Sequence, residues 1–146
     1  MKYHEALCLE ALGETDGARK IFEYIAGIGI EYFSNMHLKQ LPYWQALSLV
    51  HLGENLKAQH LLTGYRREWS TIAKTKDNGY FGTTPFFISF VDEPERLRRA
   101  QSSFLLSLCL DFEGKSEEAH RYISESVADN GEDLYALFFD RFGFLR

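Results

Sequence analysis

Apolar residues recur at helical spacing along most of the chain, and one pattern of 16 residues occurs three times. The three copies are YHEALCLEALGETDGA (3–18), YWQALSLVHLGENLKA (43–58) and FLLSLCLDFEGKSEEA (104–119). In each copy an aromatic residue lies ten positions before a glycine, a small residue seven before it and a leucine four before it, and an alanine lies five after it. Matches at such fixed offsets indicate an internal repeat built from one supersecondary unit.

The glycine of each copy predicts a turn between two helices. Glycine adopts the left-handed conformation that often ends a helix, and it does so without a Cβ penalty. Two positions later stand Thr15, Asn55 and Ser116, which we expect to be helix N-caps. Each copy therefore predicts an antiparallel helical hairpin, with the alanine of the second helix facing the small residue of the first.

The same signals place seven helices. We expect hairpin helices at 2–12 and 16–33, at 42–52 and 55–74, and at 93–112 and 116–128, with a closing helix at 132–142. Gly27 and Gly29 each weaken the second helix by about 1 kcal/mol relative to alanine, and they alternatively mark the close approach of a neighbouring helix. The apolar side of the closing helix, Leu134, Leu137, Phe138 and Phe142, is expected to cover the open end of the stack.

An aromatic insertion at 79–92 separates the second and third hairpins. Residues 80–91, YFGTTPFFISFV, carry five aromatic side chains and no charge before Asp92. Because burial of one such ring stabilises by roughly 1.5–3 kcal/mol, we expect the insertion to pack against the helices. A sugar-stacking platform is the alternative interpretation of the same residues.

These hairpins resemble the tetratricopeptide repeat (TPR), which also has an aromatic-leucine-small first helix, a glycine turn and an alanine five residues later. The glycines at 13, 53 and 114 are 40 and 61 residues apart, whereas the family's unit has about 34 residues. The proline that often closes that unit is missing, so the chain looks like a divergent repeat. The resemblance implies an all-α, right-handed array of antiparallel hairpins (a TPR-like α-α superhelix). We expect one domain over 1–146, with units at about 2–34, 42–74 and 93–129. A helical hairpin array of another kind is the alternative.

A second resemblance covers residues 79–125. The stretch GYFGTTPFFISF before a long helix is similar to the C-terminal helical-repeat part of large bacterial proteins, whose upstream part is β-rich and resembles carbohydrate-processing domains. The activity of those proteins is unsettled. The resemblance implies that this chain is a fragment of a larger protein, and the absence of an N-cap before Tyr3 points the same way.

Composition narrows the function classes. The 146 residues carry a net charge of −5, which argues against binding to nucleic acid or to an anionic membrane. No apolar run is long enough to cross a membrane and the N-terminus is too polar for a signal peptide, so we expect a cytoplasmic protein. Cys8 and Cys109 occupy equivalent repeat positions, which favours two buried free thiols over a disulfide.

The sequence contains no recognisable catalytic motif. His4 and Glu5 begin an HExxH-like pattern, but Cys8 stands where the second histidine belongs, so a surface histidine is the better interpretation. The arginines at 96, 98 and 99 fit the solvated face of a helix better than an anion site. We expect no catalytic residue, no metal and no cofactor.

In the family that the hairpins resemble, partners bind in a concave groove lined by the first helices. Transferred by offset from each glycine, this implies eleven groove residues: Tyr3, Leu7, Glu10, Gln40, Tyr43, Leu47, His51, Gln101, Phe104, Leu108 and Asp111. The set is more apolar than a clamp for a peptide carboxylate, which argues against a charged peptide terminus as the ligand.

Two functional hypotheses follow. The favoured one is a non-enzymatic interaction or scaffold module that docks a protein partner or its own upstream domain, with homo-oligomers forming through the exposed end of the array. The alternative is an accessory domain of a carbohydrate-active bacterial enzyme that packs on or completes its glycan site. Stabilisation by sugars distinguishes them, since only the alternative predicts it.

Overall fold

The computed structural model describes residues 2–29, 40–74 and 94–144, and within these ranges it contains seven α-helices and no strand. The chain divides into two compact units, Met1–Tyr65 and Arg66–Leu145. The single domain expected over 1–146 stays a prediction. No helix in the described ranges is long and apolar enough to cross a membrane. The aromatic insertion at 79–92 lies outside the described residues.

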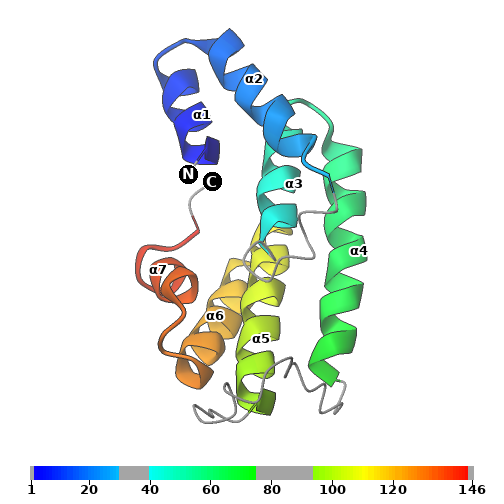
Figure 1. Ribbon diagram of the computed structural model, residues 1–146, viewed down its shortest axis with the longest axis vertical. Helices are drawn as coiled ribbons and strands as arrows, with labels where there is room; N and C mark the ends of the chain where they lie inside the picture. The colour runs from blue at the N-terminus through cyan, green and yellow to red at the C-terminus, as the bar shows by residue number, and fades with distance from the viewer. Residues whose placement is uncertain (1, 30–39, 75–93, 145–146) are drawn as a thin grey trace, which may run out of the picture. The chain divides into compact units, whose positions relative to one another are not determined.

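The helices follow the order expected from the sequence (Figure 1). They are α1 (Lys2–Ala11), α2 (Thr15–Ala26), α3 (Leu41–His51), α4 (Asn55–Lys74), α5 (Pro94–Phe112), α6 (Ser116–Asp129) and α7 (Leu134–Phe142). All predicted bounds agree with these to within two residues except the end of α2. The all-α fold class is therefore confirmed for the described residues.

The helix α2 ends at Ala26, seven residues before the predicted end at 33. The Gly27 N–H donates to the Glu23 carbonyl at 3.0 Å, and the Ile28 N–H turns back to the Ile25 carbonyl at 3.3 Å, which closes a tighter last turn. The prediction was wrong because the apolar periodicity continues past Gly27 and Gly29, whereas the helical conformation of the backbone ends at Ala26. The part of the predicted helix beyond Gly29 lies outside the described residues.

The three repeat turns have the same hydrogen bonds. Their glycines, Gly13, Gly53 and Gly114, have φ of 82°, 82° and 78°. Each glycine N–H donates to the carbonyl three residues earlier at 2.9–3.0 Å, and the next N–H donates to the carbonyl of the repeat leucine at 2.8–2.9 Å. This pair of bonds is the Schellman motif, and it confirms the predicted role of the glycines.

The N-cap prediction was wrong by one residue. Thr15 and Ser116 are the first residues of their helices, and the caps are Glu14 and Lys115, which make no side-chain cap bond. The Glu14 carbonyl accepts from the N–H of Ala18 at 3.1 Å, and the other two turns repeat this bond. The residue after each glycine thus donates its N–H to the helix before the turn and accepts at its carbonyl from the helix after it. These two backbone bonds keep the loop short.

The repeat positions form the cores of the units. The aromatic residues ten before each glycine, the small residues seven before and the alanines five after are all at most 3% exposed. They are Tyr3, Tyr43 and Phe104; Ala6, Ala46 and Ser107; and Ala18, Ala58 and Ala119. These positions confirm that the repeat pattern of the sequence marks the core.

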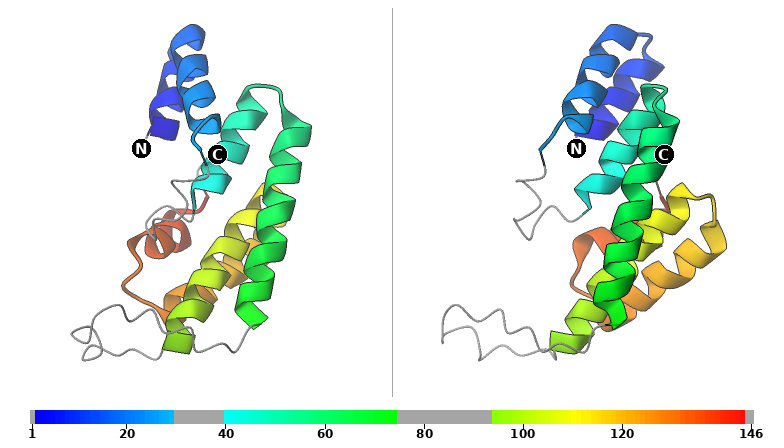
Figure 2. Two further views of the ribbon diagram at one scale, coloured as in Figure 1. Left: turned by 45° about the vertical axis from the view of Figure 1, so that its right-hand side comes forward. Right: turned by 90° about the vertical axis from the view of Figure 1, so that its right-hand side faces the viewer.

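Within the repeat hairpins of each unit, the two helices run antiparallel, as α1 and α2 do in the first unit and α5 and α6 in the second (Figure 1). In the first unit α1 packs against α2, and α2 against α3; in the second, α5 packs along α6, and α6 against α7 (Figure 2).

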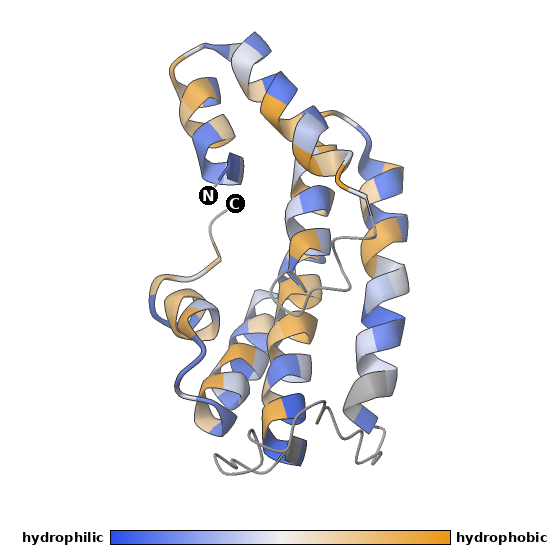
Figure 3. Ribbon diagram, viewed as in Figure 1, coloured by the Kyte–Doolittle hydropathy of each residue, from blue (hydrophilic) through white to orange (hydrophobic). Residues whose placement is uncertain are grey.

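Polar residues dominate the first turns of α5 and hydrophobic residues its later turns (Figure 3). The polar start is held by ion pairing, since Arg99 donates to the Asp129 carboxylate, with Nη2 2.8 Å from Oδ1.

The prediction for α7 was wrong in its orientation. Leu134, Leu137, Phe138 and Phe142 are exposed, whereas Ala136 and Phe139 are buried. The Asp133 carboxylate caps this helix and accepts from the N–H groups of residues 135 and 136 at 2.9 and 3.1 Å. The buried side of α7 is therefore formed by Ala136 and Phe139, and the four predicted residues lie on its exposed side.

Candidate functional site

The eleven residues predicted to line a first-helix groove divide into two sets. Six are buried, at 6% exposure or less: Tyr3, Tyr43, Leu47, Phe104, Leu108 and Asp111. Five keep some exposure: Leu7, Glu10, Gln40, His51 and Gln101. The offset from the glycine therefore selected core positions as well as surface ones, because the first helices are enclosed by their neighbours.

Three of the predicted residues, Tyr3, Glu10 and His51, do meet in the first unit. The Tyr3 hydroxyl lies 3.2 Å from His51 Nε2, and Glu10 Oε2 lies 3.0 Å from His51 Nδ1. The His51 ring also stacks on Phe22, with ring centroids 4.4 Å apart and planes at 11°. One imidazole thus joins residues of α1 and α2 to α3.

The polar contacts of this cluster hold α1 against α3. Burial, together with the charge of Glu10, raises the pKa of Tyr3 to about 12, so its hydroxyl keeps the proton and donates it to His51 Nε2. With Nε2 accepting from Tyr3, the His51 ring donates from Nδ1 to the Glu10 carboxylate. Every polar group in the cluster has a partner, so the cluster orients α1 on α3 and presents no activated nucleophile.

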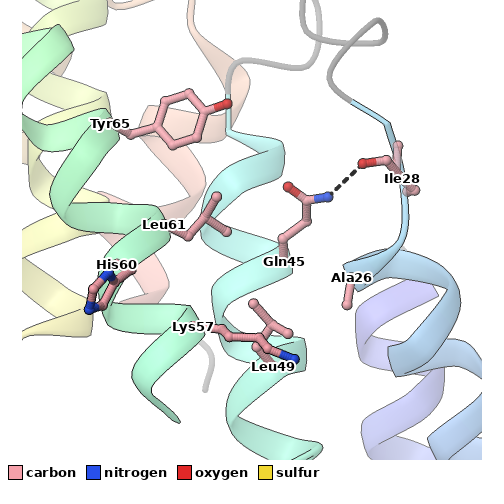
Figure 4. A pocket seen from close by; sticks show the side chains of 8 residues that line it. All are labelled: Ala26, Ile28, Gln45, Leu49, Lys57, His60, Leu61 and Tyr65. Carbon is pink, nitrogen blue, oxygen red and sulfur yellow. Dashed lines mark hydrogen bonds between the residues drawn. The ribbon is translucent and has the colours of Figure 1, made fainter. Parts of the chain in front are cut away.

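A groove in the first unit offers a binding surface that the sequence analysis did not identify (Figure 4). It has a volume of about 580 Å³ and is lined by residues from the end of α2, from α3 and from the first half of α4. We call it the α2–α4 groove, and its lining residues are Ala26, Ile28, Gln45, Leu49, Lys57, His60, Leu61 and Tyr65.

The Gln45 side chain is the polar centre of the groove. Its Nε2 donates to the carbonyls of Ile25 at 3.2 Å and Ile28 at 2.9 Å, one in the last turn of α2 and one just beyond the end of that helix. These two bonds use both amide hydrogens and fix the orientation of the amide. The side-chain oxygen consequently points away from α2 and toward Leu61 (Figure 4).

A sequence signal for Gln45 existed. It stands eight positions before Gly53, inside the apolar run LPYWQALSLV, and it is 5% exposed. A buried amide in an apolar run requires hydrogen-bond partners, so it indicates either a satisfied core group or a binding site. Both descriptions fit Gln45, since its nitrogen is satisfied by the backbone and its oxygen faces the groove.

The rest of the groove combines aliphatic walls with a basic rim. Ile28, Leu49 and Leu61 supply the walls, and the rim groups are Lys57 and His60 from α4. The Lys57 ammonium lies 3.1 Å from Glu54, but both side chains are exposed, and such pairs contribute little in water. The lining residues include no carboxylate, so the groove favours an apolar ligand that also carries negative charge.

The two cysteines differ, and one prediction about them was wrong. Both thiols are free; Cys109 is buried as expected, but Cys8 is exposed. Burial, aided by the charge of Glu113, raises the pKa of the Cys109 thiol to about 12. Within the part of the chain that the structure describes, no three His, Cys, Asp or Glu side chains gather as a metal site would require.

The chain matches no protein-family model, no curated protein and no solved structure.

Proposed function

We propose that this protein is a non-enzymatic interaction or scaffold module, a TPR-like right-handed array of antiparallel helical hairpins that binds a segment of a protein partner. Three hairpins with the same turn and the same buried positions support a repeat architecture, which commonly presents extended binding surfaces. The observation that carries the proposal is the α2–α4 groove, with Gln45 fixed at its centre.

The groove defines the chemistry of the ligand. Aliphatic walls accept an apolar side chain, and the Gln45 oxygen accepts a hydrogen bond from a peptide N–H or a hydroxyl. The Lys57 ammonium at the rim attracts a carboxylate. The partner segment is thus a short peptide with an apolar anchor next to an acidic residue, supplied by another protein or by an upstream part of the same polypeptide.

Selection from a random peptide library tests this proposal. Phage-displayed 12-residue peptides are selected on the intact chain, and the enriched peptides are then titrated by fluorescence anisotropy. We expect apolar residues beside acidic ones, and we expect Leu61→Asp and Lys57→Glu each to weaken binding roughly tenfold, the effect of losing a central contact of about 1.4 kcal/mol.

Two variants serve as matched controls for the selected peptides. Leu12→Asp and Lys74→Glu change an exposed leucine and an exposed lysine outside the groove and should leave the affinity unchanged. Enriched peptides that bind all four variants equally, or a library that yields no enriched peptide, would contradict the proposal.

The carbohydrate alternative draws on residues 79–92, which lie outside the described residues, and none of the surfaces described above favours it. A thermal-shift screen compares the two functions. Stabilisation by oligosaccharides without stabilisation by the selected peptides would replace the interaction module with the glycan-binding accessory domain.

A further inference from the structure

The Gln45 amide in the α2–α4 groove can take only one orientation. Its side chain is 5% exposed, and both hydrogens of Nε2 are used by the carbonyls of Ile25 at 3.2 Å and Ile28 at 2.9 Å. Turning the amide over would place its oxygen against these two carbonyl oxygens, which are acceptors as well. A solvated glutamine can present either its nitrogen or its oxygen to a ligand, whereas Gln45 presents only an acceptor.

The oxygen of this amide is available to a ligand. Among the described residues nothing donates a hydrogen bond to Gln45 Oε1, which points away from α2 and into the groove (Figure 4). The Lys57 ammonium on the rim instead lies 3.1 Å from Glu54 Oε1. An acceptor that is fixed, buried and directed into a cavity is the kind of polar group that orients a ligand.

The walls around this oxygen determine what a ligand must supply. Leu49 follows one turn later on α3, Leu61 lies on α4, and Ile28 lies just beyond the end of α2. An apolar anchor seated against these side chains displaces water from the oxygen. Because a buried acceptor without a donor loses its hydration and gains nothing in return, a ligand that fills the groove must bring an N–H or an O–H to Gln45.

A backbone N–H meets this requirement for almost any anchor residue. Every residue except proline carries one beside its own side chain, so an anchor that reaches the walls brings its N–H toward Gln45. In a helix that group is bonded to the carbonyl four residues earlier, except in the first turn. An extended segment, in contrast, keeps its N–H groups free to pair with the protein that binds it.

We propose that Gln45 is the specificity-determining residue of the α2–α4 groove, and that it selects a partner segment bound in an extended conformation through the backbone N–H next to the apolar anchor. This selection rests on the proposed function, since it requires that the groove receives a peptide. A helical segment with the same apolar and acidic residues is excluded, because its N–H at the anchor is already bonded. Ile25 and Ile28 act on the ligand indirectly, because their carbonyls fix the amide that contacts it.

Amide-to-ester exchange in the ligand tests the proposal. A peptide enriched from the library is synthesised as a series in which each backbone N–H is replaced in turn by an ester oxygen, and each analogue is titrated by fluorescence anisotropy. We expect one ester, at or next to the apolar anchor, to weaken binding to the unaltered chain at least about tenfold, because it leaves Gln45 Oε1 without a donor. Esters far from the anchor should leave the affinity nearly unchanged.

A double-mutant cycle assigns this loss to Gln45. Gln45→Met removes both the donors and the acceptor at a similar side-chain volume, so the parent peptide and the sensitive ester should bind this variant equally. If Gln45 only held the end of α2 in place, the substitution would weaken both peptides by the same factor and their difference in affinity would remain. Gln59→Met changes an exposed glutamine of α4 outside the groove lining, so as the matched control it should preserve that difference.

The conformation of the bound peptide can be measured without any substitution in the protein, so it tests the proposal even where Gln45→Met does not fold. Transferred nuclear Overhauser effects should show strong contacts between each α-proton and the next amide proton, as an extended chain gives. They should show no series of contacts between successive amide protons, which a helix gives.

The outcomes separate this proposal from the proposed function. A library without enriched peptides, or peptides whose binding Leu61→Asp does not weaken, would overturn both. Binding that Leu61→Asp weakens but that no ester weakens would overturn only the selection by Gln45. An ester penalty that persists in Gln45→Met, or a peptide that binds as a helix, would also overturn that selection alone.

Discussion

The same substitution, glycine to alanine, should change stability in opposite directions at two positions of the second hairpin. Gly53 has φ of 82°, a conformation that costs an L-residue roughly 1–2 kcal/mol. A Cβ added there meets no atom within 4 Å, so the cost is conformational and not steric. Alanine also restricts the unfolded chain, which offsets roughly 0.4–1 kcal/mol of that cost. Gly53→Ala should therefore lower the free energy of unfolding by roughly 1 kcal/mol.

Gly64 is the matched control. It lies inside α4 without a positive φ, and its added Cβ also meets nothing within 4 Å. Alanine in a helix interior is more stable than glycine by roughly 0.5–1 kcal/mol, so Gly64→Ala should raise the free energy of unfolding. Urea denaturation of both variants, with equal m-values, provides the measurement. Shifts of the same sign, or a neutral Gly53→Ala, would refute the role assigned to the repeat turns.

Three further predictions concern other parts of the two units. Gln45→Ala should lower the thermal midpoint and cost roughly 1–3 kcal/mol, because the Ile28 carbonyl loses this donor and the Ile25 carbonyl keeps only the Ile28 N–H; an unchanged midpoint would contradict this. Cys8 should react with a thiol reagent in the folded protein and Cys109 only after unfolding, and the reverse order would show that the burial assigned to them is wrong. Burial opposes ionisation of Glu113, but hydrogen bonds from Lys115 and Arg66 outweigh this effect and lower the pKa of Glu113 from 4.5. The contribution of the ionised carboxylate to stability is therefore complete above pH 4.5 and is lost as the pH falls through the lowered pKa. Arg66→Gln should flatten that loss in acid unfolding curves, and superimposable curves would count against the ion pair.

The sequence predicted what local backbone chemistry and periodicity determine. The repeat glycines fix the three turns, and the offsets around them identify the buried aromatic and small residues. The bounds of α4 were predicted to the residue, because Asn55 follows a Schellman turn directly and turn residues follow Lys74. Such features depend on residues close together in the chain.

The remaining features depend on residues far apart in the chain. The early end of α2 is fixed by Gln45, whose partners lie 17 and 20 residues away, so periodicity alone could not reveal it. The α2–α4 groove likewise forms only where residues of three different helices come together. Orientation of α7 could not be predicted either, because an amphipathic pattern does not say whether its larger or its smaller face is buried.

Whether the α2–α4 groove receives a partner segment can be tested by an NMR titration. Amide chemical shifts of the intact, isotope-labelled chain are followed while a library-selected peptide is added. We expect the largest changes to fall on the residues that line the groove, with Gln45, Leu49 and Leu61 among them. Changes confined to residues outside the groove, or none at saturating peptide, would contradict it.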